Sequence, residues 1–245
     1  MDCAVINLDK DVARWEKLHA ELTRVGIVHR RFSAVNGREL GSEHDHLMLP
    51  GTRMFTPKGL VGSALSHYLV LTEFLKGSHE ACLVLEDDAV LDDKVVENLS
   101  LVMSNAPKGW DMIKLVSWPY KYEGPNVLQK WTVSVDYVAR LVSREGARKL
   151  VAQKIAWPCY ADGTFWFIPN FNVYIVNEKY RTFYQTWETS SIAGSRYHCY
   201  ELNLKVLRTG PYEWAVGDVL LLLGVVAVGV VLRQIKSKSL HPNKR

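Results

Sequence analysis

Apolar and polar residues follow two alternating patterns along the chain: short continuous apolar runs, and longer segments in which apolar residues recur every three or four positions. The first pattern is typical of buried strands and the second of amphipathic helices. Strands are expected at residues 3–8, 28–35, 82–85, 110–116 and 132–141. Helices are expected at residues 12–25, 59–76, 94–105 and 143–153. This alternation predicts an α/β fold with a mostly parallel central sheet.

The apolar run 82–85 ends in three consecutive carboxylates, Glu86, Asp87 and Asp88. If the chain stays extended there, Glu86 and Asp88 point to one side and Asp87 to the other, because side chains of a strand alternate between faces. Two carboxylates at the carboxyl end of a strand suit a hard divalent cation that also binds a diphosphate. A solvated acidic turn at the end of a strand explains the triplet equally well.

Three further polar residues lie in apolar stretches of the sequence. Ser66 and His67 occupy the middle of the expected helix 59–76, where a single histidine is more often a core residue than a catalytic one. Asp162 lies among aromatic residues and precedes Gly163. A carboxylate in apolar surroundings has a pKa shifted by desolvation, which is a mark of function, whereas Asp-Gly is equally typical of a turn.

Composition narrows the class of protein. The chain has 245 residues, of which 48% are hydrophobic and 23% charged, and this excludes general disorder. The net charge of +4 owes much to residues 233–245, which hold five basic residues and no acidic ones, so the body of the protein is not expected to bind nucleic acid. The four cysteines form no C-x-x-C pair, and the N-terminal residues lack the pattern of a secretory signal peptide. We therefore expect a protein of the reducing cytosol.

The C-terminal region has a different character. Residues 215–232 are apolar except for Asp218, and the basic stretch 233–245 follows. A membrane-inserted hydrophobic helix is favoured over a buried core helix, since the segment approaches the length that spans a bilayer. The expected organisation is a globular domain at residues 1–210 and a membrane-associated part at 211–245, on the cytoplasmic face of a membrane. Two arrangements stay open: a crossing segment, or one lying in the inner leaflet with its lysines on anionic lipid.

Several motifs occur in an order that resembles glycosyltransferase family 25, which includes bacterial lipooligosaccharide galactosyltransferases and collagen-modifying enzymes. Asn36 stands where the family usually has aspartate in an Ala-Val-Asp-Gly turn. The matching segments are VINLDKDVARW, RFSAVNG, GLVGSALSHYLV, LVLEDDAVL, YVARLVSREGARKLV and PCYADGTF. Together they cover about residues 4–195.

The resemblance implies a GT-A-like fold and a nucleotide-sugar donor, most often UDP-galactose. In this family the acidic triplet takes the place of the D-x-D motif, which implies that Asp88 and Glu86 bind Mn²⁺ (or Mg²⁺). The cation would neutralise the diphosphate as it leaves. Inverting transfer also needs a base for the acceptor hydroxyl, and Asp162 is the expected one, with Asp88 as the other catalytic residue.

The remaining implied contacts are with the donor. The residues expected to bind it are Asn7, Leu8, Arg14, Ser66, His67 and Asp87. The implied partners are a nucleotide sugar, a glycan or lipid-linked acceptor as in lipopolysaccharide synthesis, and a membrane. Two alternatives remain: a non-catalytic carbohydrate-binding or scaffold member of the family, and a metal-dependent phosphohydrolase.

Overall fold

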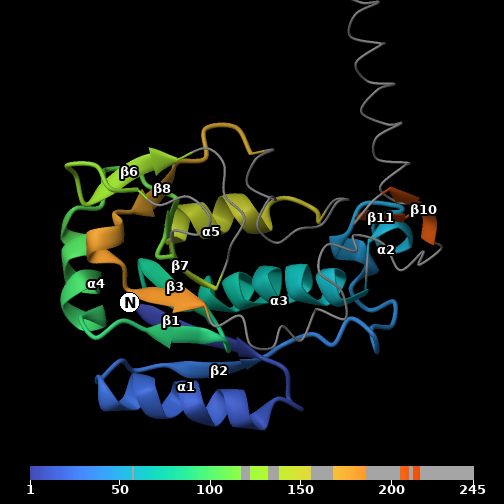
Figure 1. Cartoon of the computed structure of the whole chain (residues 1–245), viewed down its shortest axis with the longest axis horizontal. Coiled ribbons are helices and arrows are strands. Elements are labelled where there is room, and N and C mark those ends of the chain that lie inside the picture. The colour runs from blue at the N-terminus through green and yellow to red at the C-terminus, as the bar shows by residue number, and fades with distance from the viewer. Residues whose placement is uncertain are drawn as a thin grey trace, which may run out of the picture. The chain divides into compact units, whose positions relative to one another are not determined.

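The computed structural model describes residues 1–56, 58–116, 122–131, 138–155 and 168–185, and the backbone of residues 205–209 and 212–215 (Figure 1). Contacts within the chain divide it into two units, Met1–Ala193 and Gly194–Arg245. In the second unit, strands β10 and β11 form an antiparallel pair. Their bounds are Lys205–Thr209 and Tyr212–Ala215.

A seven-stranded sheet in the order β2-β1-β3-β7-β5-β8-β6 forms the centre of the first unit. Its strands are β1 Asp2–Asn7, β2 Arg30–Ser33, β3 Ala81–Glu86, β5 Met112–Lys114, β6 Leu128–Trp131, β7 Ala139–Ser143 and β8 Val173–Val176. The pairs β1–β2, β1–β3 and β5–β8 are parallel, whereas β3–β7, β5–β7 and β6–β8 are antiparallel. The expected mostly parallel sheet is therefore a mixed one, because β7 inserts between β3 and β5 in the opposite direction.

Helices cover both faces of this sheet. They are α1 Val12–Arg24, α2 Thr52–Phe55, α3 Lys58–Phe74, α4 Val95–Ser104 and α5 Arg144–Val151, with short 3₁₀ turns η1 Asp45–Leu47 and η3 Glu178–Tyr180. Alternate residues of β1 and β3 separate the two cores. Cys3 and Leu83 pack with α1 and α4, whereas Ala4 and Val84 pack with α3 and α5. This alternation is what a strand buried on both faces requires.

Most of the expected elements are confirmed, including the helix expected at 143–153. Ser143 caps its N-terminus, because the Oγ of Ser143 accepts a hydrogen bond from Gly146 N at 2.9 Å. Two differ. The stretch between the strand expected at 28–35 and the helix expected at 59–76, for which no element was expected, contains η1 and α2. The strand expected at 132–141 begins only at Ala139 in the part of the chain that the structure describes, and residues 132–137 lie outside it.

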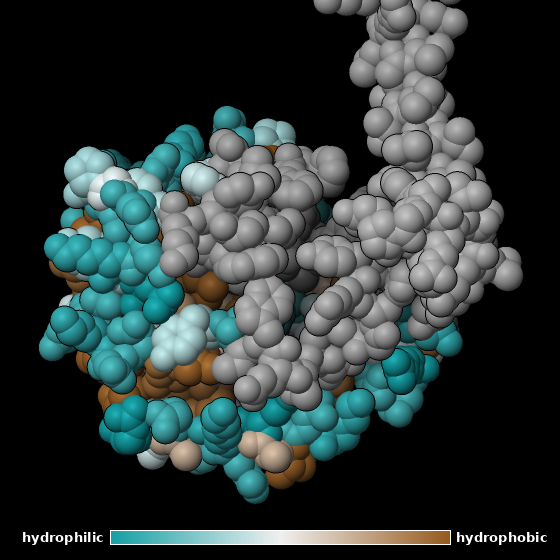
Figure 2. All heavy atoms as spheres, viewed as in Figure 1, coloured by the Kyte–Doolittle hydropathy of each residue, from teal (hydrophilic) through white to brown (hydrophobic). Residues whose placement is uncertain are grey.

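A small antiparallel sheet of β4 (Ala89–Leu91) and β9 (Phe183–Gln185) lies next to the acidic triplet in sequence. The face drawn in Figure 2 is mainly hydrophilic over the described residues, with small hydrophobic areas between them. Within the described ranges, every helix is too short or too polar to cross a bilayer. The expected membrane helix covers residues 215–232. Its first residue, Ala215, ends β11, and residues 216–232 lie outside the described ranges.

Candidate functional site

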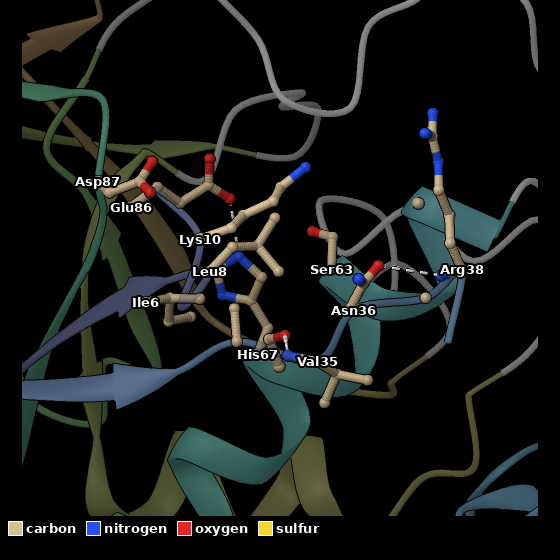
Figure 3. A pocket seen from close by; sticks show the side chains of 14 residues that line it. Ile6, Leu8, Lys10, Val35, Asn36, Arg38, Ser63, His67, Glu86 and Asp87 are labelled. Atoms are coloured by element: carbon tan, nitrogen blue, oxygen red, sulfur yellow. Dashed lines mark hydrogen bonds and ion pairs between the residues drawn. The ribbon is translucent and has the colours of Figure 1, made fainter. Parts of the chain in front are cut away.

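A pocket lies at the carboxyl ends of β1 and β3 (Figure 3). These strands are parallel neighbours, with Ile6 opposite Glu86, so their ends meet at one edge of the sheet, where α/β proteins commonly bind ligands. The pocket encloses about 710 Å³, including solvent at its mouth. Its lining residues come from these strand ends, from the segment after β2 and from α3. They are Ile6, Leu8, Lys10, Ala34, Val35, Asn36, Gly37, Arg38, Gly59, Ser63, Ser66, His67, Glu86 and Asp87.

Ser66 joins α3 to the segment after β2. Its Oγ donates to Gly62 O at 2.7 Å and accepts from Val35 N at 2.8 Å. The hydroxyl is buried and both bonds are to backbone atoms. Ser66 lines the pocket, where a residue that contacts the nucleotide sugar would have to lie. Its hydroxyl also holds the backbone at Val35 against α3.

Glu86 and His67 are hydrogen-bonded at the pocket wall. Nε2 of His67 lies 2.9 Å from Oε1 of Glu86, and Nδ1 of His67 lies 2.8 Å from Nη2 of Arg140. Burial raises the pKa of Glu86 to about 7, against a smaller lowering by Arg140. Burial, together with Arg140, holds the pKa of His67 well below its usual range. The imidazole is therefore neutral, and the Glu86 carboxyl can exchange a proton near neutral pH.

Asp87 is held by the first strand and first helix. Its Oδ2 accepts from Asn7 Nδ2 at 2.6 Å and its Oδ1 pairs with Arg14 Nη1 at 3.1 Å. Burial raises the pKa of Asp87, and the bonds from Asn7 and Arg14 oppose that effect. Nε of Arg31 donates to Asn7 Oδ1 at 2.9 Å, which completes the fixing of the amide. Asn7, Arg14 and Asp87, three residues predicted from sequence, are thus brought together.

Asp88 points elsewhere. Its Oδ2 accepts from Gln185 Nε2 at 2.9 Å, and the pocket lining includes Glu86 and Asp87 but not Asp88. The extended backbone that would place Glu86 and Asp88 on one side is not present, because β3 ends at Glu86 and the next two residues form a turn. Alternation of side chains holds only while the backbone stays extended.

The other predicted residues are divided between the pocket and the undescribed parts of the chain. Leu8 lines the pocket. Asp162, the expected base, lies outside the described residues.

No group of three or more His, Cys, Asp or Glu side chains suited to a metal ion occurs within the described ranges. Mn²⁺ and Mg²⁺ bound to nucleotide substrates need only one or two protein carboxylates, and Glu86, partly exposed in the pocket, offers one.

Three cationic residues of the site were missed from sequence: Lys10, Arg38 and Arg140. Lys10 and Arg38 carry no local signal, because charged residues near turns are common. Arg140 did carry a sequence signal, because it interrupts the apolar strand β7. In the structure it is only 1% exposed. A charged residue at a buried strand position requires partners, and searching for them would have pointed to the site.

Comparison with known proteins agrees with the motif order. The sequence profile described as "Glycosyltransferase family 25 (LPS biosynthesis protein)" matches residues 1–138. A glycosyltransferase 25 family member of Aedes aegypti is 28% identical over 176 residues, which cover 61% of this chain and 28% of that protein. Procollagen galactosyltransferase 2 of Homo sapiens is 31% identical over 170 residues, which cover 60% of this chain and 26% of that protein. The chain thus matches little more than a quarter of the length of these relatives.

Among solved structures, a glycosyltransferase involved in the glycosylation of the major capsid of PBCV-1 aligns with 78% of this chain and 95% of its own. The TM-score is 0.45 and the identity 12%, too low to support an argument about fold or activity. The family profile, in contrast, covers more than half of the chain, including β1, β3 and both pocket carboxylates. The resemblance seen in the motifs is confirmed, and the chain belongs to glycosyltransferase family 25.

Proposed function

We propose that this protein transfers a sugar, with galactose as the first candidate, from a UDP-sugar to a hydroxyl group of a glycan or glycolipid. The observation that carries the proposal is the pocket, which combines the carboxylates of Glu86 and Asp87 with the cations of Lys10 and Arg38. Its place beyond the carboxyl ends of two parallel strands is also where nucleotide-binding α/β folds hold their ligand, which supports a GT-A-like reading of the sheet.

The two pocket cations suit a diphosphate. Figure 3 shows Lys10 close to Glu86 and Asp87, and Arg38 on the other side of the pocket. Neither side chain forms an ion pair with any other described residue, and both are exposed. Cations without a protein partner beside a pocket are available to an anionic ligand. The diphosphate of a nucleotide sugar would engage both.

The same site can accept a divalent cation. Glu86 is the pocket carboxylate proposed as a ligand of Mn²⁺ or Mg²⁺, with Asp88 as the second; Asp88 would have to exchange its bond from Gln185. A bound cation would neutralise the charge that develops on the departing diphosphate. Asp87, tied to Arg14 and Asn7, fixes the neighbouring turn.

The reaction proposed is a direct displacement. The acceptor oxygen forms a bond to the anomeric carbon, and the bond from that carbon to the diphosphate oxygen breaks, so that UDP leaves. The acceptor hydroxyl passes its proton to a carboxylate, for which Asp162 is proposed. This course inverts the anomeric centre. Lipid-linked acceptors are part of the same proposal and are supported by the family description, which names lipopolysaccharide biosynthesis. A place on the cytoplasmic face of a membrane is also part of the proposal, and its basis is the apolar segment 215–232 with the basic residues after it.

UDP release by the full-length protein tests the proposal, with a panel of UDP-sugars and with glycan and glycolipid acceptors. We expect release with one sugar, lost on chelation of divalent metal and in Glu86→Ala, and strongly reduced in Asp88→Ala. Glu97→Ala, on the exposed face of α4, is the matched control and should keep full activity. Sugar binding without turnover would favour the scaffold alternative, and release of inorganic phosphate without sugar transfer would favour the phosphohydrolase.

A further inference from the structure

A buried arginine, Arg140, contacts His67, one of the residues that line the pocket. Arg140 lies on β7, between Val84 of β3 and Lys114 of β5 in the strand register, and it does not line the pocket. Arg140 is 1% exposed as a whole residue, and His67, on α3, is 4% exposed. Arg140 of β7 therefore contacts His67 of α3, and His67 contacts Glu86 of β3. His67 and Glu86 line the pocket, whereas Arg140 does not.

The positions of the hydrogens between Arg140, His67 and Glu86 follow from the chemistry of the arginine side chain. A guanidinium only donates hydrogen bonds, so Nδ1 of His67, 2.8 Å from Nη2 of Arg140, accepts one. The imidazole hydrogen then lies on Nε2, which is 2.9 Å from Oε1 of Glu86, and that oxygen accepts it. The histidine cannot adopt the other tautomer without placing two donors against each other.

We propose that Arg140 is a positioning residue, which fixes His67 as its Nε2–H tautomer so that His67 holds the Glu86 carboxyl at the pocket wall. Oε1 of the carboxyl is thereby occupied by His67, while Glu86 lines the pocket. The effect on turnover rests on the proposed function, since it assumes that Glu86 serves sugar transfer. The tautomer itself does not depend on any activity.

The direct test is a ¹⁵N NMR experiment on the full-length protein with labelled histidine, in which long-range couplings distinguish protonated from bare ring nitrogens. The His67 signals are assigned by their loss in His67→Gln. We expect a bare Nδ1 and a protonated Nε2 in the unaltered protein. A hydrogen on Nδ1 would overturn the proposal, whether or not any variant of Arg140 folds.

Substitutions of Arg140 distinguish a role in positioning His67 from a role in packing the core. Arg140→Met removes the donor and should release the single tautomer, whereas Arg140→Lys keeps a donor and should retain it. Arg144→Met is the matched control: its guanidinium donates to the carbonyl oxygens of Leu75, Gly77 and His79, away from the pocket, and the His67 pattern should not change.

Kinetics provide the second readout. Residues that orient a functional side chain without touching the substrate typically contribute about ten- to a hundred-fold to activity. We expect kcat to fall by about that factor in Arg140→Met, with KM for the donor nearly unchanged and with rescue by Arg140→Lys. Loss of kcat in Arg144→Met as well would indicate a general effect on the fold and contradict the positioning role. If no transferase activity exists at all, the proposed function fails while the tautomer result still decides the role of Arg140.

Discussion

Gly37 and Gly62 pack directly against each other, where the segment after β2 crosses α3. A Cβ on Gly62 would lie 2.6 Å from Gly37 N, and a Cβ on Gly37 would lie 2.9 Å from Gly62 N and closer still to the carbonyl oxygen of Lys58. The obstructing atoms are backbone atoms, which cannot rotate away. This contact sets the distance between two walls of the pocket, because Asn36 and Arg38 flank one glycine and Ser63 follows the other.

Gly62→Ala is expected to destabilise the protein. The added methyl group forces the two backbones apart, and overpacking of this kind typically costs about 1–3 kcal/mol. Urea denaturation measures the change in the free energy of unfolding. Gly77→Ala is the control, because its Cβ would meet only Phe74 O, at the ordinary contact distance of 3.5 Å. Equal stability of the two variants would show that the contact between the glycines is looser than the structure has it.

The pH dependence of stability should reveal Glu86. Its folded-state pKa is about 7, above the ordinary value of 4.5, so between these values the folded protein holds a proton that the unfolded chain has lost. The free energy of unfolding therefore loses a contribution as pH rises from about 5 to 7, of order 1 kcal/mol. His67 acts in the opposite direction, because its lowered pKa makes the unfolded chain take up the extra proton below about pH 6.5.

Glu86→Gln removes the contribution of Glu86 to the pH dependence and leaves that of His67. Stability of that variant should rise more steeply from pH 5 to 7 than stability of the unaltered protein, as measured by urea denaturation at several pH values. Glu97→Gln, which alters an exposed carboxylate on α4, should leave the profile unchanged. Parallel profiles for the unaltered protein and Glu86→Gln would mean that Glu86 ionises as it would in water.

Lys10 should contribute to binding of the diphosphate. Lys10→Ala removes an exposed pocket cation that has no ion-pair partner among the described residues, and we expect UDP affinity to fall about tenfold, as for a lost charge-assisted hydrogen bond. Isothermal titration calorimetry measures this directly. Lys17→Ala, which removes an exposed cation of α1 outside the pocket, should bind UDP normally. Unchanged affinity in Lys10→Ala would place the diphosphate elsewhere.

Cys3 and Cys82 should be chemically inert in the folded protein. They are 3% and 0% exposed, and burial raises the pKa of Cys3 to about 12 and that of Cys82 further. Because the thiolate is the reactive form, both should resist Ellman's reagent at pH 8 until the chain unfolds. The measurement uses a variant with serine at Cys159 and Cys199: no thiol is expected before denaturation and two after it. Rapid reaction in native buffer would contradict the burial of strands β1 and β3.

Residues 211–245 are predicted to hold the protein at a membrane. The apolar segment 215–232 would insert into the bilayer, and the basic stretch 233–245 would bind anionic lipid. Deletion of 211–245 should therefore move the protein from the membrane fraction to the supernatant. A variant with only the basic residues of 233–245 replaced by glutamine distinguishes insertion, which would persist, from binding to anionic lipid, which high salt would also weaken. Full-length protein in the supernatant would reject the membrane assignment.

The local pattern of the sequence was sufficient for the four long helices, for the strands β1, β2, β3, β5 and β7, and for part of the site. Asn7, Leu8, Ser66, His67, Glu86 and Asp87 were identified from motifs at strand ends and in one helix, and the pocket or its direct supports contain all of them. The reason is that parallel neighbouring strands place their carboxyl ends together, so residues there meet without further information. The roles assigned to these residues, as to Asp88 and Asp162, remain proposals.

Relationships across the chain were decided only by the tertiary structure. Periodicity shows which face of a strand is buried, but it does not show which strand lies beside it or in which direction. The antiparallel insertion of β7 between β3 and β5 brings Arg140 to His67, 73 residues away, and makes the sheet mixed. The end of β3 at Glu86 turns Asp88 toward Gln185. The sequence by itself determined the four long helices, the strands β1, β2, β3, β5 and β7, and the residues at their ends. Strand order, register and the exact end of a strand depend on long-range packing, and they determined which of those residues share a site.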